Sequence, residues 1–275
     1  MLTGPEDKAP LVEHLVELRQ RLIIAIGAIF GIFCLILLGG FDEAIFAFLV
    51  QPLRKVAGPD VKMVYLGLHH AFYIYMKVSL FAAFFLASPI ILIQIWRFVA
   101  PGLYQHERNT VLPFLIATPV LFFLGGALAY FFVLPLAFQF FLSYTSPSIE
   151  SLPAMPDYLS LVMTFLFAFG LSFELPVFLL LLISAGFLST EKLVQVRRYQ
   201  IVMVFIVAGI LTPPDPFSQI LLAVPLLLLY EVSIFTGRIL EKRRKEREEQ
   251  AEHEEHQAEV MAAAHKPDSM VGKEE

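Results

Sequence analysis

Long apolar runs separated by short polar segments dominate the chain. A membrane-spanning helix needs about 20 predominantly apolar residues. The candidate runs cover residues 22–40, 72–96, 111–142 and 157–185, then a shorter stretch over 201–211 and a last one over 217–235. This pattern predicts an all-α polytopic membrane protein with six transmembrane helices.

Lys and Arg residues concentrate in alternate segments between these runs. If the N-terminus is cytoplasmic, 16 of the 20 basic residues fall on the cytoplasmic side, as the positive-inside rule requires. The opposite side holds the other four, Arg54, Lys55, Lys62 and Lys77. We therefore predict that both termini are cytoplasmic (N-in/C-in), with the first outer loop as the segment that departs from the rule.

Prolines fall within or at the ends of the apolar runs, at positions 89, 113, 119, 135, 176 and 225. Proline inside a helix removes a backbone hydrogen bond and kinks the helix, so we expect bent helices and a concave bundle. The run 201–211 rises only about 16 Å, which is about half of the hydrocarbon core. Either the bilayer thins around it, or Arg198, Tyr199 and Gln200 extend the span.

Polar segments flank this hydrophobic block at both ends. Residues 1–21 contain an amphipathic helix, whose leucines share one face while Glu17 and Arg21 share another, so we expect it to lie along the cytoplasmic interface. Residues 22–236 form the six-helix transmembrane domain. Residues 237–275 form a charged cytoplasmic tail, which we expect to be dispensable.

Composition narrows the function classes. The 275 residues are 57% hydrophobic and 16% charged, with a net charge of −5 and a mean hydropathy of +0.71, whereas soluble domains are about 25% charged. The sequence contains no basic segment interleaved with aromatic residues, so it does not indicate a nucleic-acid partner.

Residues suited to metal binding or catalysis are scarce. Cys34 is the only cysteine, and the pair His69-His70 has no further metal ligand at suitable spacing. Because motifs for nucleotide, metalloprotease or serine-hydrolase chemistry do not occur, we expect no enzyme activity, no cofactor and no metal.

Candidate recognition residues gather at the cytoplasmic ends of the first runs. Glu17 stands four residues before Arg21, a spacing typical of an ion pair on a helix surface. In the second cytoplasmic loop, Trp96 is a typical interfacial anchor, and Glu107 follows a histidine. On pattern alone, each of these groups has a purely structural explanation.

Glu174 is an acidic residue deep inside the fourth run, about 15 Å from its cytoplasmic end. An ionisable group there costs about 2.5–3.5 kcal/mol on insertion scales and usually faces a bundle interior or a wet cavity. It is either a neutral acid bonded near the kink at Pro176 or a functional group. A small-solute secondary transporter centred on Glu174 is therefore the alternative function.

Two further polar residues stand near the last breaker. Asp215 precedes Pro216, the residue types preferred at the N-cap and the first position of a helix, so we predict that it caps the sixth span. Gln219 follows one turn later and is expected to bond to a neighbouring segment.

Four segments together resemble the TatC family, a subunit of the twin-arginine translocase. They are EHLVELRQRL (13–22), FVAPGLYQHER (98–108), FAFGLSFELPV (167–177) and LTPPDPFSQ (211–219), in the family's order over about residues 10–236. The resemblance implies a glove-shaped receptor of the cell inner membrane that binds twin-arginine signal peptides of folded cargo. It also implies single-span TatA and TatB partners, self-association in the receptor complex, contact with membrane lipid, and export driven by the proton-motive force.

The resemblance also assigns roles to particular residues. A signal-peptide site would contain Glu17 and Glu107, with His14, Arg19 and Phe98; Glu174 and Gln219 would line the concave face; Pro52 and Asp215 match further functional positions. A carboxylate accepts two parallel hydrogen bonds from a guanidinium, a geometry that lysine cannot reproduce. A pair of glutamates at the membrane surface is therefore suited to two consecutive arginines.

Overall fold

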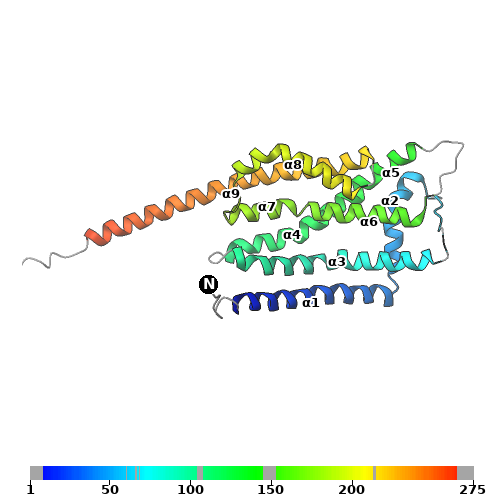
Figure 1. The fold of residues 1–275 in the computed structure, drawn as a ribbon, viewed down its shortest axis with the longest axis horizontal. Helices are drawn as coiled ribbons and strands as arrows, with labels where there is room; N and C mark the ends of the chain where they lie inside the picture. Colours follow the sequence, from blue (N-terminus) through cyan, green and yellow to red (C-terminus); the bar gives the residue numbers. More distant parts are fainter. Residues whose placement is uncertain are drawn as a thin grey trace, which may run out of the picture.

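The computed structural model describes residues 9–59, 61–65, 67, 69–103, 108–144, 153–212 and 215–264. Its helices are α1 (Ala9–Leu38), α2 (Asp42–Ala57), α3 (His70–Leu103), α4 (Arg108–Leu128), the π-helical turn η2 (Ala129–Val133), α5 (Leu134–Ser143), α6 (Met155–Ser172), α7 (Leu175–Ser184), α8 (Thr190–Leu211) and α9 (Pro216–Ala264) (Figure 1). Within these residues, β pairing is limited to one isolated bridge between Val64 and Ala154. The all-α prediction is confirmed.

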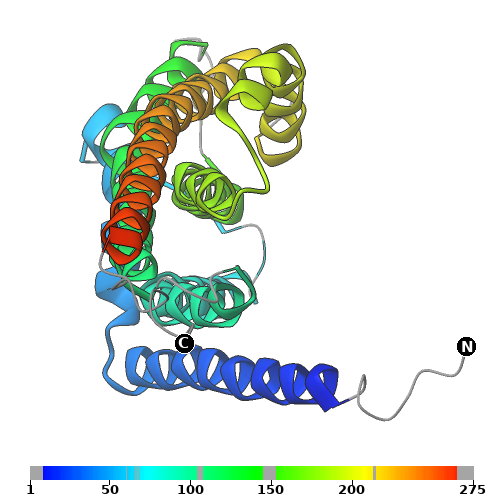
Figure 2. The same cartoon turned by 90° about the vertical axis from the view of Figure 1, so that its left-hand side faces the viewer.

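The six predicted spans are present. They correspond to α1, α3, the sequence α4–η2–α5, the pair α6–α7, α8, and the first part of α9. The N-terminal end of α1 and the C-terminal end of α9 lie toward the same end of the molecule (Figure 1). Viewed from that end, the helices follow an open curve from α1 and α3 to α8 (Figure 2), so the bundle is concave.

The segment predicted as the first outer loop is largely a helix, α2, which runs across the ends of the spans (Figure 1). Its first turn is acidic and its last turn contains Arg54 and Lys55, an order that complements the helix dipole. Gly40 and Gly58 have positive φ angles of 66° and 96°, which let the chain turn sharply at either end. One face of α2 packs into the main core, where it buries Leu49, Val50, Pro52 and Leu53.

Two of the expected proline effects appear as breaks in the α-helical hydrogen bonding. Pro135 follows η2, where the N–H of Leu134 donates to the Ala129 carbonyl five residues back. Pro176 stands in the first turn of α7, directly after the break that separates α6 from α7. The helices continue through the other sites, at Pro89, Pro113, Pro119 and Pro225.

Two helices extend beyond their predicted limits. α1 is a single helix of 30 residues, so the amphipathic N-terminal segment and the first span are continuous, and α1 packs chiefly on α3. α8 has 22 residues and is about 33 Å long. Arg198, Tyr199 and Gln200 lie within this helix, so the helix of the fifth span continues past the apolar run 201–211, as expected. Local bilayer thinning stays a prediction.

Candidate functional site

Glu17 of α1 lies in a small polar cluster at the end of the bundle where α1 begins. Its Oε1 accepts hydrogen bonds from Arg21 Nε at 3.0 Å and Arg21 Nη2 at 2.5 Å, so the predicted ion pair is confirmed. Its Oε2 lies 3.8 Å from His14 Nδ1 and accepts no hydrogen bond from a described residue. Because 35% of the Glu17 side chain is exposed, this second oxygen is available to another cation.

Two contacts fix this end of α1 against α3. Arg21 Nη1 donates to Gln94 Oε1 at 3.3 Å. The His14 ring stacks on Phe98, with 4.2 Å between ring centres and 17° between planes. The structure thus brings Glu17, His14 and Phe98 together. Nothing in the sequence indicates that Gln94 belongs to this cluster, because its partner Arg21 is 73 positions away.

Other expected members of this cluster are not joined to it by the described contacts. Arg19 is exposed on α1 and makes no hydrogen bond or ion pair with the described part of the chain. Glu107 lies outside the described residues, although it directly precedes Arg108, where α4 begins.

The position of Trp96 differs from the prediction that this residue is an interfacial anchor. Its side chain is only 8% exposed and packs with Val177 and Leu181 of α7. It therefore joins α3 to α7 inside the bundle, where a long apolar side chain is stabilised by burial.

Glu174 occupies the break between α6 and α7, directly before the first residue of α7. Its carboxyl group hydrogen-bonds with the side chain of Thr118, a fully buried residue of α4. The expectation of a hydroxyl partner near the kink is therefore met. Glu174 Oε1 is buried without a partner among the described residues, and a buried polar atom left unpaired is costly. Glu174 thus keeps unused hydrogen-bonding capacity within the span.

Close packing of α4 on α6 makes the contact between Thr118 and Glu174 possible. A Cβ placed on Gly125 would lie 2.4 Å from the Phe169 carbonyl oxygen and 2.8 Å from Cδ2 of the Phe173 ring. No real Cβ approaches that closely, so only glycine allows this approach of α4 to α6.

Asp215 and Gln219 close the hairpin between α8 and α9. Asp215 Oδ1 accepts a hydrogen bond of 2.7 Å from the Ser218 backbone N–H, which confirms the predicted helix cap. Gln219 Nε2 donates to the Phe205 carbonyl oxygen at 2.8 Å, so the expected bond to a neighbouring segment reaches α8. Both residues therefore stabilise the last two spans.

Pro52 lies far from the Glu17 cluster, at the opposite end of the bundle. It is buried within α2, and the helix that carries it crosses the ends of the spans (Figure 1). Any role of Pro52 in function must therefore act through the placement of α2.

Comparisons with known proteins agree with this arrangement. Residues 13–225 match the family described as "TatC: Sec-independent protein translocase protein (TatC)". Relatives named Sec-independent protein translocase protein TatC include one from Magnetococcus marinus, 58% identical over 242 residues, with 88% of this chain and 89% of that protein covered. Another, from Escherichia coli strain K12, is 40% identical over 243 residues, with 88% and 93% covered. A crystal structure described as the twin arginine translocase receptor TatC in DDM matches with a TM-score of 0.74 and 41% identity, over 82% of this chain and 99% of that chain.

Proposed function

The chain belongs to the TatC family and is a receptor component of the twin-arginine protein translocase, and we propose that the cluster around Glu17 captures the paired arginines of signal peptides. The Oε2 of Glu17, which lies 3.8 Å from His14 Nδ1 and accepts no hydrogen bond from the described residues, carries this proposal. Arg21 holds the other carboxylate oxygen, and Gln94 holds Arg21, so the carboxylate is oriented before a peptide arrives. Such preorganisation reduces the entropy lost on binding.

Glu107 is proposed as the second carboxylate of this site. Charge-assisted bonds between guanidinium and carboxylate are short and strong, and two such bonds discriminate arginine from lysine. His14 is half exposed and stacked on Phe98, which offers a flat surface on which a guanidinium can lie. Arg19, exposed nearby, is proposed to contact peptide residues outside the arginine pair.

The remaining assignments follow from the family. We propose that residues 1–21 serve recognition, that residues 22–236 form the transmembrane domain with Glu174 and Gln219 on its concave face, and that residues 237–275 form a cytoplasmic tail. The protein would work without catalysing a reaction of its own, in the cell inner membrane, with TatA- and TatB-type subunits, further copies of itself and surrounding lipid. The proton-motive force would supply the energy for export.

The alternative of a small-solute transporter centred on Glu174 finds no support among the relatives. All of those described above are translocase proteins. The Glu174 carboxyl also has a structural partner in Thr118, so its presence inside a span does not require a transported solute.

A binding measurement on the purified full chain tests the proposed function. A signal peptide with Arg-Arg should bind at least about tenfold more tightly than the same peptide with Lys-Lys, because two bidentate contacts are lost. Equal affinity for the two peptides would contradict the arginine site. Solute uptake into vesicles by this protein alone would favour the transporter.

A further inference from the structure

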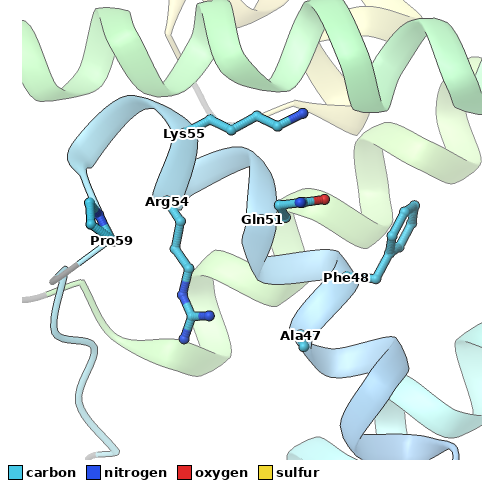
Figure 3. Close-up of a pocket in the computed structure, with 6 residues that line it drawn as sticks. All are labelled: Ala47, Phe48, Gln51, Arg54, Lys55 and Pro59. Carbon is cyan, nitrogen blue, oxygen red and sulfur yellow. The ribbon is translucent and has the colours of Figure 1, made fainter.

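A basic pocket lies beside α2, at the end of the bundle opposite to Glu17. It has a volume of about 480 Å³ and is lined by Ala47, Phe48, Gln51, Arg54, Lys55 and Pro59. Phe48, Gln51 and Lys55 extend from α2 toward the same side, and Arg54 extends from an adjacent side (Figure 3). None of these six lining residues is acidic, so the pocket favours an anion.

An apolar groove borders this pocket and runs along the spans. Its volume is about 280 Å³, and its walls come from α2, α3, α4 and η2, with one residue of α6. Phe48 lines both cavities, and the Lys55 ammonium lies 5.7 Å from the centre of the Phe131 ring, which lines the groove. The eight positions from Phe131 back to Phe123 correspond to about 12 Å of helix. The groove therefore follows the spans for most of the hydrocarbon thickness of one leaflet.

The groove surface is open to the surroundings of the bundle. Phe48 is 52% exposed and Phe131 is 56% exposed. Gly126 allows α4 to lie close to Phe85 at the wall of the groove, because a Cβ there would come within 2.5 Å of the Phe85 ring. In a membrane, an apolar groove of this kind is filled by a lipid chain or by another helix, and the charge at its mouth distinguishes the two.

We propose that the pocket and groove together bind one anionic phospholipid of the outer leaflet. The phosphate would lie between Lys55 and Arg54, whose ammonium and guanidinium groups donate charge-assisted hydrogen bonds to phosphate oxygens. One acyl chain would lie along the groove against Phe123 and Phe131. An apolar helix could fill the groove, but it would not place a full negative charge between the two cations.

Hydrogen bonds from Tyr130 to α2 orient a further polar side chain in the proposed headgroup site. The Tyr130 hydroxyl lies 2.7 Å from the Phe48 carbonyl oxygen and 3.2 Å from Gln51 Oε1. Its single proton is shared between these two acceptors, which turns the amide oxygen of Gln51 toward Tyr130. The Gln51 N–H₂ group then remains as a neutral donor beside Lys55 (Figure 3). Binding of an anionic headgroup would also explain why Arg54 and Lys55, two of the four basic residues that depart from the positive-inside rule, lie on this side.

Fluorescence quenching by brominated lipids tests the proposal on the full-length protein in vesicles. Trp96 is the only tryptophan, so a Trp96→Phe, Phe123→Trp variant carries one reporter in the groove. Brominated phosphatidylglycerol should quench this reporter with at least about tenfold higher relative affinity than brominated phosphatidylcholine, since each basic side chain near a membrane surface contributes about fivefold. Adding Arg54→Gln and Lys55→Gln should bring the two lipids close to parity.

Matched variants separate the site from general effects. Lys62→Gln removes an exposed cation of the same outer segment and should keep the preference. Ala127→Leu fills the groove and should reduce quenching by both lipids, whereas Ala44→Leu, on an exposed face of α2, should not. Circular dichroism and gel filtration verify that each variant is folded. The proposal is overturned if the reporter variant with both cations intact prefers the anionic lipid by less than twofold, or if the preference survives loss of both cations. It is also overturned if neither lipid quenches the reporter because another helix covers it.

Discussion

The hydroxyl of Tyr130 lies 2.7 Å from the carbonyl oxygen of Phe48. In an uninterrupted helix this carbonyl would accept from the N–H of residue 52, but residue 52 is a proline and has none. Tyr130 therefore supplies from η2 the donor that Pro52 removes from α2. Tyr158 of α6 makes a second contact with the backbone of α2, with its hydroxyl 2.8 Å from the Leu49 carbonyl oxygen. Two tyrosines thus hold α2 across the ends of the spans.

This relationship predicts that the cost of losing the Tyr130 hydroxyl depends on residue 52. Tyr130→Phe leaves the Phe48 carbonyl without a donor and should lower the free energy of unfolding by about 1–3 kcal/mol. In a Pro52→Ala background the restored backbone N–H replaces the lost donor, so the same change should cost clearly less. A double-mutant cycle by unfolding in detergent measures the difference.

Tyr158→Phe is the control for that cycle. Its acceptor, the Leu49 carbonyl, faces the N–H of Leu53 rather than the position of Pro52. Its cost should therefore be equal in the two backgrounds. If Tyr130→Phe also costs the same in both, the compensation between Tyr130 and Pro52 is refuted.

Glu17→Gln and Glu107→Gln should each weaken signal-peptide binding about tenfold or more. Each change removes the charge that strengthens hydrogen bonds to an arginine, and such bonds contribute about 1.5–3 kcal/mol. Isothermal titration with an Arg-Arg peptide measures the effect. Glu13→Gln is the matched control, because Glu13 is exposed one helical turn before Glu17, and it should bind normally. Full affinity in a folded double variant of Glu17 and Glu107 would refute the assignment.

At Glu174 the size and hydrogen-bonding capacity of the side chain should matter more than its charge. Glu174→Gln can still bond to Thr118 and should be tolerated much better in export than Glu174→Leu or Glu174→Arg. Peptide capture should survive in all folded variants, because the proposed site of capture is the Glu17 cluster at the end of the bundle and Glu174 lies about 15 Å along the span. Export compared at equal membrane levels tests this. A Gln variant as inactive as the Arg variant would show that ionisation of Glu174 is required.

The C-terminal tail should be dispensable only beyond its first turns. Glu241 Oε1 accepts from the Thr190 backbone N–H at 2.9 Å, and Oε2 accepts from the Thr190 hydroxyl at 2.5 Å. This carboxylate therefore caps α8 from α9. Glu241→Ala should lower stability by about 1–2 kcal/mol, while Glu249→Ala, an exposed change in the same helix, should not.

Truncation separates the same two parts of the tail. Removal of residues 250–275 should leave export unchanged, whereas removal from residue 240 onward should reduce the amount of folded protein in the membrane. Loss of export in the shorter truncation, at normal membrane levels, would show that the distal tail has a function of its own.

The amino-acid sequence alone determined the number of spans. A helix in lipid satisfies its own backbone hydrogen bonds and requires only a sufficient apolar length, so both conditions can be read from local sequence. The same holds for the Asp215 cap and for the ion pair between Glu17 and Arg21, since each partner lies within one helical turn of the other. The family motifs also depend only on residue order.

The tertiary structure decided which apolar faces meet protein and which meet lipid. In a membrane both environments are apolar, so hydrophobic patterning does not distinguish a buried face from an exposed one. For this reason the sequence predicts an interfacial anchor at Trp96, whereas the structure buries this side chain against α7. Apolar length does not predict helix α2, because it has 16 residues with charges at both ends and is too short to span. The bonds from Tyr130 to Phe48 and from Thr190 to Glu241 join residues 82 and 51 positions apart, and only the packed bundle brings such distant groups together.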